Sequence, residues 1–366
     1  MVIVRVLAVV GGVALVVWTL VSALKTVVVP RAHLSILTRV HFATLRRAFD
    51  AVASRQRSFA FRDRVMALYA PLGLVTLPAV WVTLIIIGFS GLVWGTGDQS
   101  FADAFITSGS SLLTLGFVKP DGVARVALSF MEAGIGLGVV SLMISYLPTI
   151  YGAFSRRESL VGMLEVRAGL PPSSAELLTR YARIGMVDNI ADDLFAPWEQ
   201  WFIDVEESHT SQAALAFFRS PHPDRSWITA AGCVLDTAAI VASTIDRPYN
   251  ARGPLMLRSG FFCLRRIADV YQIPYDPNPT WETPISVTRR EFDLLCVEIQ
   301  AMGLPLKADR DQAWRDFCGW RANYDTVLVA LCSLVMAPPA KWSSDRMPER
   351  GVHAPMWFPV RRARKG

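Results

Sequence analysis

Three long segments near the start of the chain carry almost no ionised side chains: residues 6–24, 65–97 and 126–154. A helix needs roughly 20 apolar residues to cross the hydrocarbon core of a bilayer, because its backbone polar groups must pair within the segment. Each segment therefore predicts a membrane-spanning helix. The second is longer than one crossing requires and holds Pro71 and Pro78, so we expect it to be tilted or kinked.

The first of these segments has two readings. A secretory signal peptide also contains an apolar stretch, but the uncharged run between Arg5 and Lys25 is long for one, and the following VVVPRAH offers no clear small-residue cleavage site. We therefore expect a membrane span that is retained.

The stretch between the first two spans is strongly basic. Only Asp50 and Asp63 oppose its arginines, which are Arg31, Arg39, Arg46, Arg47, Arg55, Arg57, Arg62 and Arg64. Basic residues collect in the cytoplasmic loops of membrane proteins, so we expect the N-terminus outside and everything after Arg156 inside. Apolar residues recur at helical spacing in this linker and predict an amphipathic helix on the inner surface: Leu34, Leu37, His41, Leu45, Phe49 and Val52.

The remainder of the chain shows frequent helical periodicity and little strand alternation, which predicts a mostly helical cytoplasmic domain. Its apolar runs 227–245 and 324–336 are expected to be buried core helices, because Asp236 interrupts the first and the second is too short to span a membrane. The predicted fold class is an all-α membrane protein. Its expected parts are a first transmembrane helix (1–30), a basic linker (31–64), a pore domain (65–155), a helical cytoplasmic domain (156–340) and a basic tail (341–366).

Composition supports a membrane protein and gives no sign of catalysis. Hydrophobic residues make up 52% of the chain, with a mean hydropathy of +0.34, and the excess lies in the first part of the sequence. The net charge of +6 is concentrated beside the spans, so it reports membrane orientation rather than nucleic-acid binding. The five cysteines form no CxxC pair and are expected to be reduced core thiols.

No motif after Arg156 identifies a ligand for the domain. It holds no GxGxxG, no P-loop and no EF-hand loop, and no Ser, His and Asp combination with enough context for catalysis. An acidic stretch before His209, formed by Asp204, Glu206 and Glu207, is expected to be an exposed helical face rather than a metal site. We therefore expect no enzyme activity, no metal and no cofactor.

The stretch 101–120, FADAFITSGSSLLTLGFVKP, lies between two predicted spans. It is too apolar for an exposed loop and too short to cross a membrane and return. Such a segment is expected to dip into the membrane, which is tolerated only where its backbone is buried in protein or faces a water-filled cavity. Several copies would then surround a common axis.

Residues within this stretch resemble the pore loop of the potassium channel family. In that family a short pore helix leads into a filter of the TVGYG type and then into an inner helix. Here 101–113 resembles the pore helix, Ser111 occupies the place of an earlier threonine, and the filter positions are taken by Thr114, Leu115, Gly116 and Phe117. The resemblance covers roughly residues 65–154 and implies an ion-conduction filter at 114–118 in a homotetramer that conducts potassium or another monovalent cation.

The chemistry of these residues suits that resemblance, with two departures. Backbone carbonyl oxygens and a threonine hydroxyl can replace the water shell of a cation, and Gly116 permits the backbone angles that aim carbonyls at an axis. The family's second filter glycine is replaced by Val118, and its aspartate by Lys119. Four Lys119 ammonium groups at the pore mouth would repel cations, an effect that Asp121 would partly offset.

Features of the third span allow two interpretations each. Glu132 either supports the pore helix from behind, through Ser108 or Ser110, or lies near the outer interface. The small and helix-bending residues either form a gating hinge or allow close helix packing; they are Gly134, Gly136, Gly138 and Pro148.

The sequence thus predicts a pore-loop cation channel of the plasma or inner membrane, in contact with lipid and modulated by its cytoplasmic domain. The alternative is a membrane sensor or scaffold that keeps the channel fold without conducting. A third reading is a membrane enzyme, which would need a pocket of convergent reactive residues. Oligomeric state does not separate the first two readings, because both predict a tetramer. Ion flux does separate them.

Overall fold

The structure, a computed structural model, describes residues 2–29, 35–53 and 58–347. Those residues form helices and turns and no β-strand, so the predicted all-α class is confirmed for them. The chain divides into two compact units. The first comprises Met1–Asp50 and Leu68–Tyr151, and the second comprises Ala51–Ala67 and Gly152–Gly366.

Three helical segments are long and apolar enough to cross a membrane: Val2–Val27, Phe59–Gly95 and Val123–Ala168. This confirms the three predicted spans by length and composition. The second is two helices rather than one bent helix, because α3 (Phe59–Ala67) and α4 (Tyr69–Gly95) are separated at Leu68. Pro71 falls in the first turn of α4, where its missing N–H needs no partner.

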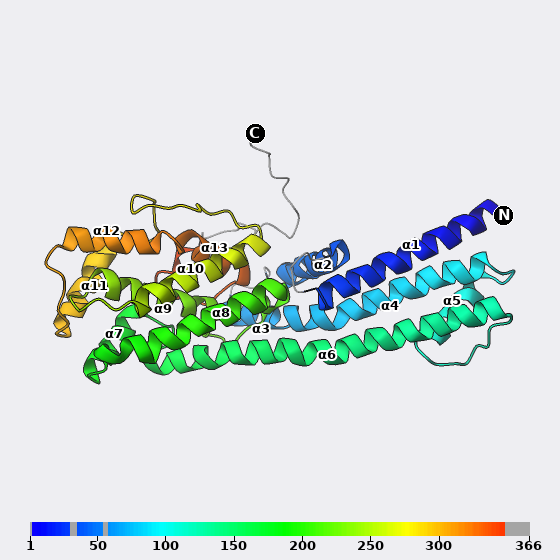
Figure 1. The fold of residues 1–366 in the computed structure, drawn as a ribbon, viewed down its shortest axis with the longest axis horizontal. Coiled ribbons are helices and arrows are strands. Elements are labelled where there is room, and N and C mark those ends of the chain that lie inside the picture. The colour runs from blue at the N-terminus through cyan, green and yellow to red at the C-terminus, as the bar shows by residue number, and fades with distance from the viewer. Residues whose placement is uncertain (1, 30–34, 54–57, 348–366) are drawn as a thin grey trace. The chain divides into compact units, whose positions relative to one another are not determined.

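In the first unit, α1 (Val2–Val27) packs along α4 through glycines (Figure 1). A Cβ atom added at Gly12 would collide with the carbonyl oxygen of Gly88, and one added at Gly91 would lie 2.9 Å from that of Ala8. Close backbone approach of this kind is how helices gain packing energy in lipid, where burial of apolar surface supplies little. These close contacts at the glycines hold α1 against α4.

The predicted amphipathic helix is present as α2 (Ile36–Ala53). It contacts α1 through a cluster of hydroxyl groups. The hydroxyl oxygens of Thr26 and Thr38 lie 2.7 Å apart, and those of Ser22 and Ser35 lie 2.5 Å apart. The Nε2 atom of His41 lies 3.1 Å from the carbonyl oxygen of Gly73 on α4. Four residues quoted for this linker, Arg31, Leu34, Arg55 and Arg57, lie outside the described residues.

The third span continues further than the sequence indicates. The apolar run ends before Arg156, but α6 (Val123–Ala168) is one uninterrupted helix of 46 residues, with Pro148 inside it. Its length of about 69 Å is more than twice the thickness of a bilayer core. One face of α6 in the first unit is left exposed and apolar at seven-residue spacing: Phe130, Leu137, Ile144 and Tyr151.

The second unit is a helical domain with a continuous apolar core. Besides α3 and the end of α6 it contains α7 (Ser174–Arg183), η1 (Val187–Asn189), η2 (Ala191–Phe195), α8 (Ala196–Ser211), η3 (Ala213–Phe217), α9 (Trp227–Ser243), α10 (Arg252–Val270), α11 (Arg289–Ala301), α12 (Arg310–Arg321), α13 (Asp325–Val335) and η4 (Ser344–Arg346). The two apolar runs predicted as core helices are α9 and α13, and both are largely buried. All five cysteines are free and buried, as expected.

The one acidic residue inside the first of these runs, Asp236, is buried because it has a charged partner. Arg321 forms ion pairs with Asp236 and Asp325, and the hydroxyl of Tyr324 donates to Asp236 at 2.8 Å. Burial raises the pKa of Asp236, and Arg321 opposes that shift. A buried charge that lacked such partners would destabilise the fold strongly, so this cluster fixes α9, α12 and α13 relative to one another.

Candidate functional site

The stretch between α4 and α6 forms a short helix and a returning loop. The helix, α5 (Phe101–Leu112), begins at the residue where the apolar pattern predicts it. Ser100 caps its start by accepting a hydrogen bond from the backbone N–H of Asp103 at 3.2 Å. At 12 residues α5 is about 18 Å long, too short to cross a bilayer. Residues 113–122 lead the chain back to α6 (Figure 1).

The end of α5 has a backbone conformation that usually selects glycine. The N–H of Leu115 donates to the carbonyl oxygen of Ser110 at 2.9 Å, and that of Thr114 to Ser111 at 3.0 Å. These two bonds form a Schellman motif, whose central residue must be left-handed. Thr114 takes that position with φ of 57°. A threonine there costs about 1 kcal/mol more than a glycine, so the residue is held in a strained conformation.

Several backbone N–H groups of the loop point to one residue, Ser110. The N–H groups of Leu115 and Gly116 point to the carbonyl oxygen of Ser110, at 2.9 and 3.3 Å. Those of Phe117 and Val118 point to its hydroxyl oxygen, at 3.1 and 3.3 Å. Gly116, with φ of 71°, supplies the second left-handed residue that this curvature requires. Four successive amide groups are therefore directed back toward α5.

Among the described residues, no group donates a hydrogen bond to the carbonyl oxygens of residues 114–118. The side chains of Leu115 and Phe117 are 60% and 65% exposed. Lys119 and Asp121 are also exposed and form no ion pair within the described part of the chain. The loop thus presents carbonyl oxygens and apolar side chains that this chain alone leaves uncovered.

The rear of α5 is braced by α4 and α6. Glu132, only 1% exposed, accepts a hydrogen bond from the hydroxyl of Ser108, and that hydroxyl oxygen lies 3.1 Å from the carbonyl oxygen of Ile86. The structure therefore contains the Ser108 contact and not the Ser110 contact, since Ser110 serves the loop. Three helices meet at Ser108.

The three closely spaced glycines of the third span, Gly134, Gly136 and Gly138, have different surroundings. A Cβ atom at Gly136 would collide with the carbonyl oxygen of Leu112, the last residue of α5, whereas Gly134 and Gly138 have nothing within 4 Å. Gly136 thus allows close packing at the end of α5. The gating hinge at Gly134, Gly136, Gly138 and Pro148 stays a prediction. Ser111 donates to the carbonyl oxygen of Thr107 at 2.9 Å, on its own helix.

The second unit offers less chemistry. No cluster of three or more His, Cys, Asp or Glu suited to a metal occurs in the described residues. The acidic stretch is exposed as expected at Asp204 and Glu207, but His209, which follows it, does not share that exposed face. His209 is fully buried, with its Nε2 atom 3.1 Å from the guanidinium of Arg157. Burial and the nearby Arg157 charge hold the pKa of His209 well below its usual range.

Comparison with protein-family models, with curated proteins and with solved structures gives no match. The resemblance to the potassium channel family therefore rests on the residues of the loop and the order of the helices. Ser110 is the site residue that sequence reasoning missed. The sequence did contain a signal for its separate role. Positions 108 and 110 are about 200° apart around a helix, so the two serines cannot face the same neighbour.

Proposed function

We propose that this protein is a homo-oligomeric cation channel in which residues 101–122 of each copy form the pore loop. The observation that carries the proposal is the two-sided loop: four successive N–H groups point to Ser110, and the carbonyl oxygens of residues 114–118 have no partner among the described residues. Such a row of carbonyls is what a dehydrated cation requires.

Energetics favour this function for an apolar loop next to membrane-spanning helices. A backbone carbonyl left unpaired in an apolar environment costs several kcal/mol, so irregular backbone survives at membrane depth only beside protein or water. An axis shared by several copies, with water and cations along it, satisfies the carbonyls. The neighbouring copies would cover Leu115 and Phe117.

The third span also suits assembly around an axis. Within its apolar window, 17% of residues are buried inside the chain, against 44% for the segment Phe59–Gly95. Its exposed apolar stripe has the seven-residue spacing by which helices pack against copies of themselves. We propose four copies, as in the potassium channel family that the loop resembles, in a plasma or inner membrane with the second unit in the cytoplasm.

The filter departs from that family in ways that bear on selectivity. Lys119 follows the proposed filter and is exposed, so four copies would place four positive charges near one pore mouth. We therefore propose permeation by monovalent cations with weaker preference for potassium than the TVGYG filter gives. Thr114 to Val118 would line the pore, with Lys119 and Asp121 at its mouth.

Cation flux into liposomes tests the proposal. Purified protein is reconstituted, and uptake of potassium, sodium and a large organic cation is compared for the natural protein, Gly116→Asp and Gly109→Ala. Gly116→Asp forces a side chain and a charge onto a left-handed position of the loop, whereas a Cβ atom at Gly109 on α5 meets nothing within 4 Å. We expect flux of the small cations, lost in Gly116→Asp and kept in Gly109→Ala.

Gel filtration and circular dichroism of each variant separate loss of conduction from loss of folding. Equal flux in Gly116→Asp and the natural protein would reject the loop as the pore. The rival function is a sensor or scaffold with a channel fold, and the charge at Lys119 is the observation that favours it. It predicts an intact oligomer that shows no flux, including after Lys119→Asp.

A further inference from the structure

Residues 213–219 of the second unit, called here the 213–219 segment, consist of η3 and the following Phe218 and Arg219. The segment joins α8 to α9, and all of η3 is buried. The N–H of Leu215 donates to the carbonyl oxygen of Gln212, just before the segment, at 2.9 Å, and the N–H of Phe218 donates to that of Leu215 at 3.1 Å.

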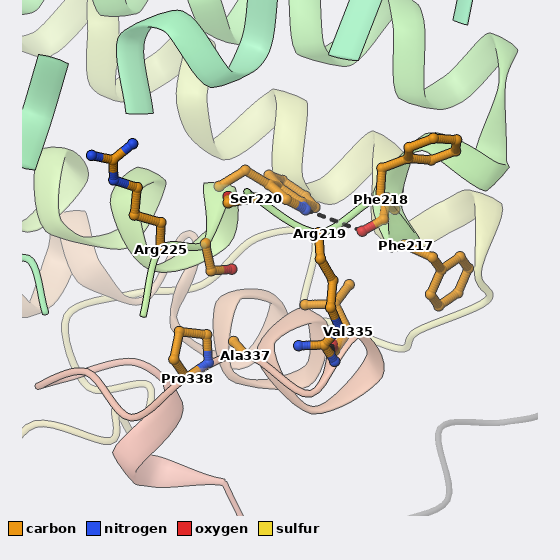
Figure 2. Close-up of a pocket in the computed structure, with 11 residues that line it drawn as sticks. Phe217, Phe218, Arg219, Ser220, Arg225, Val335, Ala337 and Pro338 are labelled. Atoms are coloured by element: carbon orange, nitrogen blue, oxygen red, sulfur yellow. Dashed lines mark hydrogen bonds between the residues drawn. The ribbon is translucent and has the colours of Figure 1, made fainter. Parts of the chain in front are cut away.

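Side chains from elsewhere in the second unit donate to four carbonyl oxygens of the segment. The indole N–H of Trp227 donates to the carbonyl oxygen of Ala216 at 3.1 Å, the dashed line in Figure 2, and the hydroxyl of Tyr271 donates to that of Ala213. Arg157 of α6 donates to the carbonyl oxygens of Leu215 and Phe218, at 2.9 and 2.7 Å. The segment is therefore fixed mainly by side chains distant in sequence.

The contact with α6 is completely desolvated. The Arg157 side chain is 1% exposed, and its backbone carbonyl accepts a hydrogen bond from the indole of Trp201 at 3.0 Å. One turn earlier on α6, the ring of Phe154 packs on that of Phe218 with centroids 5.6 Å apart. A buried guanidinium with fixed acceptors cannot leave them without a large cost, so this part of α6 moves with the segment.

The same segment holds α3. Arg219 points toward α13 in Figure 2 and donates to the carbonyl oxygen of Val335 at 2.7 Å. It also forms an ion pair with Asp63 of α3, and the two side chains are only 13% and 12% exposed. Both ends of this contact are largely shielded from water, so the pair is stronger than a surface ion pair.

We infer that the 213–219 segment mechanically couples α3 to α6. The places of α3 and α6 in the chain connect this coupling to the candidate pore loop. Only Leu68 separates α3 from α4, and α6 is the same helix that begins after the candidate pore loop. If the proposed channel function holds, one segment of the second unit controls the adjoining ends of both helices that flank the pore loop. The coupling itself does not depend on that function.

Hydrogen–deuterium exchange of the full-length protein in detergent tests the coupling. Asp63→Asn on α3 removes the ion pair with Arg219. Asp50→Asn is the matched control, because Asp50 on α2 pairs with Arg46 and that pair is more exposed. Losing a charged hydrogen bond is worth roughly tenfold or more in local opening. We expect Asp63→Asn to speed exchange about tenfold in residues 59–67, 213–219 and 152–164 together.

Reciprocity gives the second arm. Phe218→Ala, which removes a ring from Phe154 and leaves Asp63 untouched, is expected to speed exchange in α3. Faster exchange confined to α3 in Asp63→Asn, or to α6 in Phe218→Ala, would overturn the coupling. Exchange does not require conduction, so it reads the coupling even where the flux assay rejects a channel.

The consequence for conduction has its own readout. In the liposome assay, Asp63→Asn is expected to change the flux at least twofold relative to Asp50→Asn, whereas Gly116→Asp abolishes flux and leaves exchange in the second unit unchanged. Coupled exchange with unaltered flux in Asp63→Asn would reject control of the pore by this segment.

Discussion

Two short irregular stretches, the 113–122 loop and the 213–219 segment, differ in how their backbone polar groups are satisfied. Side chains of Arg157, Trp227 and Tyr271 donate to four carbonyl oxygens of the 213–219 segment, in which residues 213–217 are buried. In the loop, the N–H groups of residues 115–118 point to Ser110, and the carbonyl oxygens of residues 114–118 receive no hydrogen bond from the described residues. Among the described residues, distant side chains of the same chain thus donate to carbonyl oxygens of the 213–219 segment, and no group donates to those of residues 114–118 in the loop.

The kind of backbone group left unpaired in the loop is therefore informative about its missing partner. Irregular backbone leaves C=O groups unpaired somewhat more often than N–H groups, because each carbonyl oxygen has two lone pairs. In this loop the contrast extends over successive residues: the N–H groups of residues 115–118 all point to Ser110, and the carbonyl oxygens of residues 114–118 receive no hydrogen bond from the described residues. Together with the exposed Leu115 and Phe117, this asymmetry favours a cation and further copies of the chain as the missing partners.

The largest effect is expected where the 213–219 segment loses its buried guanidinium. Arg157→Met removes the donor to the carbonyl oxygen of Phe218, leaves that of Leu215 with only the N–H of Phe218, and leaves Glu158 without its partner. Removing one member of such a buried set costs about 3–5 kcal/mol. Denaturant unfolding followed by circular dichroism is expected to show that loss. Arg156→Met changes the exposed neighbour on the same helix and should fall within about 0.5 kcal/mol of the natural protein.

The loop should respond to loss of the serine that orders its amides. Ser110→Ala removes the acceptor of Phe117 and Val118 while keeping the carbonyl that serves Leu115 and Gly116. We expect flux to fall roughly tenfold, from about 1–3 kcal/mol of lost order. Ser111→Ala, which only breaks a bond within α5, is the control. Equal flux in both variants would contradict the role assigned to Ser110.

The buried histidine beside the segment predicts a pH dependence of stability. Burial and Arg157 lower the pKa of folded His209, and Ser208 and the ring of Trp227 are its other neighbours. The unfolded chain then binds the extra proton, so stability falls as the pH drops below about 6.5, by up to about 1.4 kcal/mol per pH unit. His209→Gln should remove this part of the acid sensitivity, and His222→Gln, a change in an exposed turn, should not.

The smallest effect concerns the strained residue that begins the loop. Thr114→Gly relieves a left-handed threonine in a Schellman motif, and should stabilise the first unit by about 1 kcal/mol. If the threonine hydroxyl serves the ion, flux should fall while stability rises. A thermal unfolding curve and the liposome assay measure the two quantities, and a loss of stability would show that the backbone strain is misassigned.

Much of the first unit could be predicted from the sequence, because lipid restricts what an apolar segment can do. The three spans and the start of α5 at Phe101 follow from apolar length and the cap at Ser100. The end of α6 could not be predicted. Charge at Arg156 marks where an apolar run stops, but a helix continues through charged residues when packing supports it, and Arg157 is buried against the second unit's own residues.

Contacts between distant residues were beyond the sequence for a different reason. The pairing of Asp63 with Arg219, and of His209 with Arg157, depends on tertiary packing that no local period reports. The divided roles of Ser108 and Ser110 follow from helix phase and were accessible in principle.

Electrical recording in planar bilayers tests conduction through the loop most directly. Purified natural protein, Gly116→Asp and Gly109→Ala are compared with potassium on one side and sodium on the other, and the reversal potential is read. A pore formed by this loop predicts cation-selective currents in the natural protein and Gly109→Ala, with a modest potassium preference, and none in Gly116→Asp. Currents that Gly116→Asp leaves unchanged, or no current above protein-free bilayers from a correctly assembled oligomer, would contradict it.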